Sequence, residues 1–168
     1  HEIDFSRLMA YKNLVFGDVL FSALGTTKEE AGSKKNQYFV DYAYQLEFAK
    51  MASENRVDVY SLVSSFGANE NSIFFYPKIK GALEQSVKRL KFKKIQIFQP
   101  PSLIRQKDLI RSIEKISLMF LKLLNNIGIL TSLTPLSVSD LAVKMLTESK
   151  LNQSERITIY KPKDLTNT

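Results

Sequence analysis

The stretch VDVYSLVSS, residues 57–65, and the stretch NSIFFYPKIKGALEQSV, residues 71–87, together determine the fold class. The first is rich in β-branched residues and ends in two serines, which is typical of a buried strand. The second predicts a helix from Pro77 to about Leu90, because proline is tolerated in the first turn of a helix. A strand that leads directly into a helix is half of a βαβ unit.

The same alternation continues on both sides of this segment. An apolar run from Val19 to Leu24, stopped by Gly25, predicts another strand buried on both faces. Helical spacing of apolar residues in 37–55 predicts a helix, and KKIQIFQPP, residues 93–101, predicts a strand ended by two prolines. Strands and helices in this order indicate right-handed βαβ units and a parallel sheet.

The last third of the chain has a different pattern. An apolar stripe predicts a helix over 108–128, and the segment 132–150 reads as a loop followed by a helix capped by Ser137 or Ser139. RITIYKP, residues 156–162, predicts a final strand. We therefore expect an α/β fold built on one parallel sheet with flanking helices.

The composition limits the possible functions. The chain has 168 residues, about the size of one domain, so we expect residues 1–168 to form a single domain. The absence of cysteine excludes disulfides and thiolate metal sites, and it suits a cytoplasmic location, which we expect. The lone histidine, His1, leaves no histidine-based metal site and no Ser-His-Asp triad. No apolar run is long enough to span a bilayer.

The net charge of +7 raises the question of nucleic-acid binding. The densest basic cluster, KRLKFKK at 88–94, follows an amphipathic helical pattern, so a solvated helix end explains it. A basic nucleic-acid-binding domain is a third possibility, behind the two discussed below.

The carboxyl ends of the predicted strands are where a ligand should bind, because parallel α/β sheets bind ligands at that edge. Three segments follow those ends, Ala23–Thr27, Ser64–Ala68 and Phe98–Leu103. We expect the chemistry of the protein at their shared edge.

Tyr76 and Lys80 are the candidate catalytic pair. Positions four apart on a helix share a face, so the Lys80 ammonium can lie near the Tyr76 phenol. A nearby cation lowers the pKa of a phenol, which could then protonate a carbonyl oxygen as hydride arrives. A hydroxyl from Ser64 or Ser65 could hold the same oxygen.

Simpler explanations exist for each of these residues. Composition alone yields roughly one tyrosine and lysine at this spacing, so the pair can be an exposed tyrosine and a solvated lysine. The serines can be a strand end whose hydroxyls satisfy loop amides, and this alternative stays open for Ser64. The strand, helix start and βαβ order together favour the catalytic interpretation.

Several blocks of the sequence resemble the atypical short-chain dehydrogenases/reductases, in particular the branch related to the HIV-Tat-interacting oxidoreductase. The resemblance runs from about Ile3 to Tyr160 and is strongest from Asp18 to Phe98. It rests on four blocks in order: DVLFSALGTTKEEAG (18–32), VDYAYQLEFAKMA (40–52), SLVSSFGANENSIFFYPKIKGALE (61–84) and LTPLSVSDLAVKML (133–146).

This resemblance implies an NAD(P)-binding Rossmann fold and a Ser-Tyr-Lys catalytic set. Tyr76 would be the general acid/base, Lys80 would bind the nicotinamide ribose and lower the tyrosine pKa, and Ser65 would orient the substrate, with Ser64 as the second choice. The cofactor would also be bound by Ala23, Leu24, Gly25, Thr26 and Pro100.

The sequence departs from the family pattern at two places. Gln99-Pro100-Pro101 stands where the family usually has Arg-Pro-Gly. None of the six glycines forms the Gly-rich fingerprint that seats a pyrophosphate on a helix N-terminus. By this alignment HEIDF, residues 1–5, is the third strand region and the first βαβ portion, roughly 60 residues, is absent. The strand ending at Leu24 would then expose an apolar edge.

The sequence therefore predicts an NAD(P)-dependent oxidoreductase acting on a small carbonyl or alcohol, and the resemblance favours NADP over NAD. The alternative is a non-catalytic nucleotide-sensing or protein-binding module on the same fold. The expected partners are a dinucleotide and a small carbonyl substrate, and a protein partner or a second copy of the chain is also possible.

Overall fold

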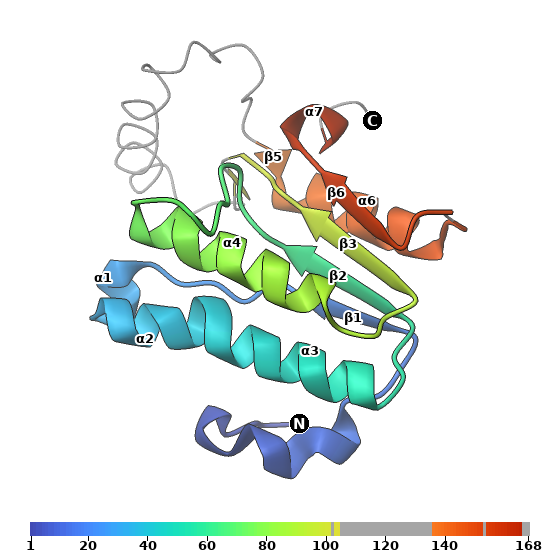
Figure 1. Cartoon of the computed structure of the whole chain (residues 1–168), viewed down its shortest axis with the longest axis horizontal. Helices are drawn as coiled ribbons and strands as arrows, with labels where there is room; N and C mark the ends of the chain where they lie inside the picture. The colour runs from blue at the N-terminus through green and yellow to red at the C-terminus, as the bar shows by residue number, and fades with distance from the viewer. Residues whose placement is uncertain (102, 105–135, 153, 166–168) are drawn as a thin grey trace.

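The computed structural model describes residues 1–101, 103–104, 136–152 and 154–165. Its centre is a parallel sheet with the strand order β1-β2-β3-β6 (Figure 1). These strands are β1 (Val19–Ser22), β2 (Val59–Val63), β3 (Lys94–Phe98) and β6 (Ile157–Tyr160). A second, two-stranded parallel sheet pairs β4 (Leu103–Ile104) with β5 (Leu136–Ser137).

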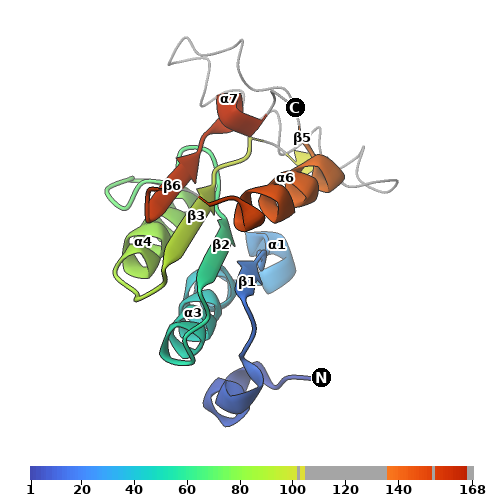
Figure 2. The ribbon, with the colours of Figure 1, turned by 90° about the vertical axis from the view of Figure 1, so that its right-hand side faces the viewer.

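Helices cover both faces of the main sheet. The helices α3 and α4 lie on one face, and α6 lies on the other (Figure 2). A π-helical turn joins α2 and α3 into one continuous rod. The described helical elements after β1 are α1 (Lys28–Ala31), α2 (Lys34–Tyr38), the π-helical turn η2 (Phe39–Ala43), α3 (Tyr44–Glu54), α4 (Phe75–Lys88), α6 (Val138–Lys150) and α7 (Pro162–Leu165).

The main core lies between the sheet and the pair α3 and α4. Alternate residues of a strand point to the same face, so every second residue of the central strands enters this core. The buried side chains from the strands are Tyr60, Leu62, Ile95 and Ile97, and those from the helices include Ala49, Ala52, Leu83 and Val87. Residues of the opposite face pack with α6, where Phe98 and Tyr160 stack with ring centroids 4.4 Å apart.

The expected α/β architecture is confirmed. Four of the five predicted strands form, all four are parallel, and the predicted helices on either side of β2 form as well. Ser137 is the cap of α6, and its hydroxyl accepts a hydrogen bond from the Ser139 amide at 3.1 Å. The helix predicted over 108–128 lies outside the described residues. No helix among the residues that the structure describes is long and apolar enough to cross a membrane.

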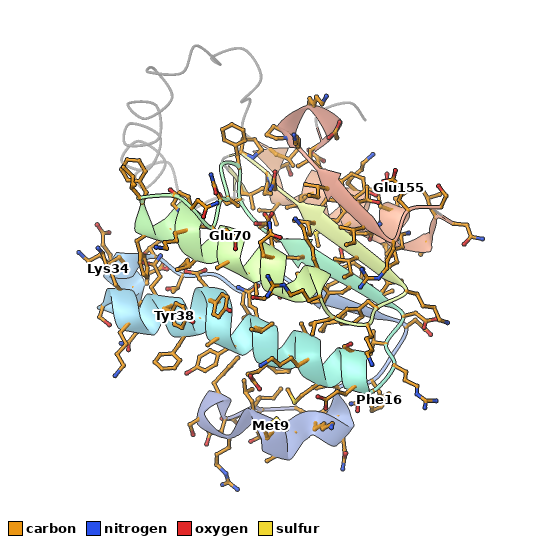
Figure 3. The ribbon with its side chains drawn as sticks, viewed as in Figure 1. Met9, Phe16, Lys34, Tyr38, Glu70 and Glu155 are labelled. Atoms are coloured by element: carbon orange, nitrogen blue, oxygen red, sulfur yellow. The ribbon has the colours of Figure 1, made fainter. Side chains whose placement is uncertain are left out.

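The prediction of a strand at HEIDF, residues 1–5, is wrong. The chain instead enters a 3₁₀ helix, η1 (Phe5–Leu14), whose first amides are capped by Asp4; its carboxylate accepts from the Ser6 amide at 2.9 Å. The Phe5 ring packs against Tyr44 at 4.9 Å between centroids, a tertiary contact that replaces sheet pairing. Met9 and Phe16 in and after this helix project into solvent (Figure 3).

The strand β1 lies at one edge of the described sheet, where it pairs with β2. Phe21 and Leu24, within and just after β1, are exposed large apolar side chains. The expectation that the strand ending near Leu24 exposes an apolar edge therefore holds for the described residues.

Candidate active site

The loops that follow β2 and β3 are held side by side at the carboxyl edge of the sheet. The Ser64 amide donates to the Phe98 carbonyl at 2.7 Å, and the Phe66 amide donates to the Pro100 carbonyl at 2.9 Å. Backbone pairing thus continues past the strand ends. It fixes the two serines of the β2 loop next to the segment that begins at Gln99.

The start of α4 is positioned by a close backbone contact at Gly81. The Asn69 amide donates to the Pro77 carbonyl at 3.0 Å, which draws the loop after β2 over the first turns of α4. A Cβ atom at Gly81 would lie 2.3 Å from the backbone of Asn69 and Glu70, so only glycine leaves room for this crossing. The contact places Tyr76 and Lys80 beside the end of β2.

Tyr76 lies at the first turn of α4, beside the Ser65 hydroxyl. Surrounding protein atoms and the negative charge of Asp41 raise the pKa of Tyr76 to about 12, while the nearby Ser65 hydroxyl lowers it. The Tyr76 side chain keeps 37% of its surface exposed, so it is accessible from solvent. The lowering of this pKa by Lys80, which the resemblance implies, stays a prediction.

Lys80 is almost completely buried one turn further along α4. Its ammonium donates to the Val63 carbonyl at 3.1 Å. Burial lowers the pKa of Lys80, and the negative charges of Asp41 and Glu84 oppose that shift. An ammonium has three donors, and the described residues supply one hydrogen-bond acceptor within range, so the group is equipped to bind a further acceptor.

Asp41 is the residue that sequence reasoning missed. It is fully buried in η2, and its Oδ1 accepts from the Thr26 amide at 3.4 Å. Among the described residues its Oδ2 has no hydrogen-bond partner. Burial raises the pKa of Asp41, and the positive charge of Lys80 opposes this shift. A buried carboxylate with a free oxygen, electrostatically coupled to Tyr76 and Lys80, belongs to the same site.

The π-helical turn explains how Asp41 reaches this position. The Gln45 side-chain amide donates to the carbonyls of Asp41 at 3.0 Å and Val40 at 3.3 Å, and its oxygen accepts from Ser22 at 2.9 Å. These bonds satisfy backbone groups at the π turn and tie it to the end of β1. Such turns are frequent at functional sites. The signal in the sequence is Asp41 itself, an acidic residue within the apolar helical pattern VDYAYQL. Acidic residues are seldom fully buried unless they are paired, so one inside such a pattern indicates a polar site.

Ser64 and Ser65 have different environments. The Ser64 hydroxyl is buried and donates to Glu84 Oε1 at 2.5 Å. The Ser65 hydroxyl contacts the Phe66 carbonyl at 3.2 Å and Tyr76, and it is only partly buried. This arrangement supports Ser65 rather than Ser64 as the serine available to a substrate.

The residues expected to bind a cofactor lie at the same edge of the sheet. Ala23, Leu24, Gly25 and Thr26 form the loop between β1 and α1, and all but the partly buried Thr26 are exposed. Pro100 is buried and bonds to the β2 loop through its carbonyl. Within the described part of the chain no group of histidine and carboxylate side chains is arranged to hold a metal ion.

Comparison with protein-family models gives no match. The chain is 40% identical over 102 residues to the mitochondrial protein fmp52 of Emericella nidulans, an alignment that covers 61% of the chain and 44% of that protein. It is 45% identical over 90 residues to the mitochondrial FMP52 of Debaryomyces hansenii, covering 52% of the chain and 40% of the relative. The chain thus spans less than half the length of these relatives.

Solved structures resemble the chain more extensively. A UDP-glucose 4-epimerase from Thermotoga maritima, solved with UDP-glucose, superposes with a TM-score of 0.65 at 11% identity, over 95% of this chain and 61% of that one. The Bordetella bronchiseptica enzyme WbmG, solved with NAD and UDP, gives 0.65 at 11% identity, over 96% and 56%. A dTDP-4-dehydrorhamnose reductase from Bacillus anthracis, solved with NADP, gives 0.53 at 12% identity, over 94% and 72%. The chain has a Rossmann-like fold.

These comparisons correct one expectation and leave another as a proposal. The relatives bear the word mitochondrial in their names, which contradicts the expected cytoplasmic location. They are named FMP52 and not HIV-Tat-interacting oxidoreductase, so the comparisons support the Rossmann-like fold and not that narrower branch.

Proposed function

We propose that the chain carries the catalytic residues of an NAD(P)-dependent oxidoreductase that acts on a small carbonyl or alcohol, in the manner of the short-chain dehydrogenases/reductases and the branch named above. One observation carries the proposal. A serine, a tyrosine and a lysine, Ser65, Tyr76 and Lys80, meet at the carboxyl edge of a Rossmann-like sheet. That edge is where ligands bind in parallel α/β sheets.

The polar groups of the site suit a dinucleotide. Ribose hydroxyls both donate and accept, so they can pair with the Lys80 ammonium, which has donors to spare, and with the unpartnered Oδ2 of Asp41. The exposed loop of Ala23, Leu24, Gly25 and Thr26 would border the cofactor, and Pro100 would line its nicotinamide end. The resemblance favours NADP over NAD.

Each catalytic residue would have a separate role. The bound nicotinamide supplies or accepts hydride. Tyr76 donates a proton to the carbonyl oxygen or removes one from the alcohol, and Ser65 holds the same oxygen by a hydrogen bond. Lys80 holds the cofactor ribose and offers positive charge to the phenolate. That charge has to offset burial and Asp41, which together raise the pKa of Tyr76 to about 12.

The raised pKa of Tyr76 also supports a second candidate, a nucleotide-sensing or protein-binding module without catalysis. A phenol whose pKa is about 12 exchanges protons slowly at neutral pH. For either function we place the protein in mitochondria, as the names of its relatives suggest.

A single substitution separates the two candidates. NADH and NADPH are titrated against the full-length protein and its Tyr76→Phe variant, and both are then assayed for cofactor oxidation with a panel of small aldehydes and ketones. The oxidoreductase proposal predicts that the variant binds the dinucleotide as before and loses turnover. Equal turnover by both proteins refutes the role of Tyr76, and binding without turnover by either supports the module.

A further inference from the structure

We propose that Glu84 is a positioning residue for Lys80: it joins α4 to the ends of β2 and β3 and supplies a buried negative charge that balances the ammonium. This inference rests on the proposed function for the importance of Lys80. Glu84 itself touches neither cofactor nor substrate in the proposed mechanism. It acts through the side chain one turn before it on the same helix face.

The hydrogen bonds of Glu84 show how firmly it is fixed. Its Oε1 accepts from the Ser64 hydroxyl at 2.5 Å and from the Gln99 side-chain amide at 2.9 Å, and its Oε2 accepts from the same amide at 3.1 Å. Ser64 follows β2 and Gln99 follows β3, so one buried carboxylate connects three elements. Those elements are the ones that frame Lys80, whose ammonium contacts the Val63 carbonyl at the end of β2.

The charges around Glu84 indicate its second role. Both of its hydrogen-bonding partners, Ser64 and Gln99, are neutral, so they satisfy the carboxylate oxygens without supplying an opposite charge. The negative charge of Glu84 favours the charged form of the buried Lys80 ammonium, one turn earlier on α4.

The other groups that face Lys80 come from two elements. Asp41 approaches from η2 and also favours the charged ammonium. Tyr76 lies one turn earlier on α4, and Asp41 raises its pKa. Of the two carboxylates, Asp41 has the larger effect on the pKa of Lys80. The Asp41 Oδ1 accepts from the Thr26 amide at 3.4 Å, whereas Glu84 is bonded to both strand ends, so Glu84 is the counter-charge that links the strands.

The test compares loss of charge with loss of a hydrogen bond. The full-length protein is labelled with ¹³C-lysine and titrated with pH in the absence of dinucleotide. NMR follows the Cε resonance of Lys80, which is assigned by its absence from the spectrum of Lys80→Met. In Glu84→Gln, which keeps an amide oxygen for Ser64, we expect the Lys80 midpoint to fall. In Ser64→Ala, which keeps the charge, the midpoint should stay in place while the melting temperature falls.

An unchanged Lys80 midpoint in a folded Glu84→Gln protein would overturn the proposal and leave Glu84 a purely structural residue. If that variant is unstable, the titration of Glu84→Gln and wild type is repeated in trimethylamine N-oxide or sucrose, osmolytes that stabilise folded states. The same downward shift is expected there. If the Lys80 midpoint falls in Glu84→Gln but the wild-type protein binds neither NADH nor NADPH, the role of Glu84 is supported. Only the proposed function is then contradicted.

Discussion

Two buried lysines, Lys80 and Lys94, lie on opposite faces of the same sheet and have different roles. Lys94 projects from β3 toward α6, where its ammonium donates to the carbonyls of Glu148 and Leu151, each at 2.6 Å. Lys80 donates to one carbonyl, at 3.1 Å, and faces two carboxylates. Burial lowers the pKa of both lysines.

The difference lies in the acceptors around each ammonium. Lys94 satisfies carbonyls at the C-terminal end of a helix, where backbone acceptors lack intrahelical partners and a positive charge is favourable. Lys80 keeps donors for another acceptor and lies beside Tyr76. A buried lysine with a lowered pKa is therefore not in itself a catalytic residue. Its remaining hydrogen-bonding capacity is the more informative property.

The largest expected effect is on turnover in Lys80→Met. Under the proposed function we expect a loss of at least about 100-fold in cofactor oxidation, because the ribose ligand and the positive charge near Tyr76 both disappear. The Lys94→Met protein, assayed under the same conditions, should keep the turnover of wild type. Equal losses in the two variants would contradict the distinction between the two lysines.

A substitution at Gly81 should weaken the α4 side of the sheet most. In Gly81→Ala the new Cβ meets the backbone of Asn69 and Glu70 at 2.3 Å, and relieving this overlap should cost about 2–3 kcal/mol in the free energy of unfolding. Urea unfolding measures the change. Lys78→Ala, at an exposed position of the same helix, is the control and should change little. A stability equal to wild type in Gly81→Ala would show that the loop crossing is not tight.

The structural role of Lys94 predicts a smaller loss of stability. Lys94→Met leaves two carbonyls at the end of α6 without this donor, which should cost about 1–2 kcal/mol. The neighbouring Lys93 is exposed and pairs with Asp58 at 2.8 Å on the surface, so Lys93→Met should cost less than about 0.5 kcal/mol. Similar losses in the two variants would contradict the buried role of Lys94.

The smallest expected effect concerns the pH dependence of stability at Asp41. Because its pKa is raised in the folded protein, the folded state binds a proton more readily than the unfolded state. Wild type should therefore gain stability relative to Asp41→Asn as the pH falls through the raised pKa toward 3.8. Chemical denaturation of both proteins across this pH range measures the change. A constant difference would mean that Asp41 titrates as an ordinary carboxylate.

The sequence was sufficient for the sheet because its strands are encoded locally. The apolar runs at Val59–Val63 and Lys94–Phe98 are bounded by turn residues and buried on both faces, which leaves little choice of structure. HEIDF was misassigned because its structure depends on distant partners. Phe5 packs on Tyr44, a contact that no local pattern reveals.

The site was partly accessible from the sequence for the same reason. The spacing of Tyr76 and Lys80 is a property of one helix, so both could be named in advance. Asp41 belongs to another element and reaches the site through a π turn held by the Gln45 side chain. The direction of the Tyr76 pKa shift follows from that distant carboxylate and from burial, and neither could be read from the helix alone.

Hydride transfer itself can be followed with an isotope. The full-length protein is incubated with NADPH or NADH that carries deuterium at both positions of nicotinamide C4, together with a panel of small aldehydes and ketones, and the alcohols are analysed by mass spectrometry. We predict an alcohol with deuterium on the former carbonyl carbon, formed by wild type and lost in Tyr76→Phe. Saturable dinucleotide binding without deuterium in any alcohol would contradict the account and favour a binding module.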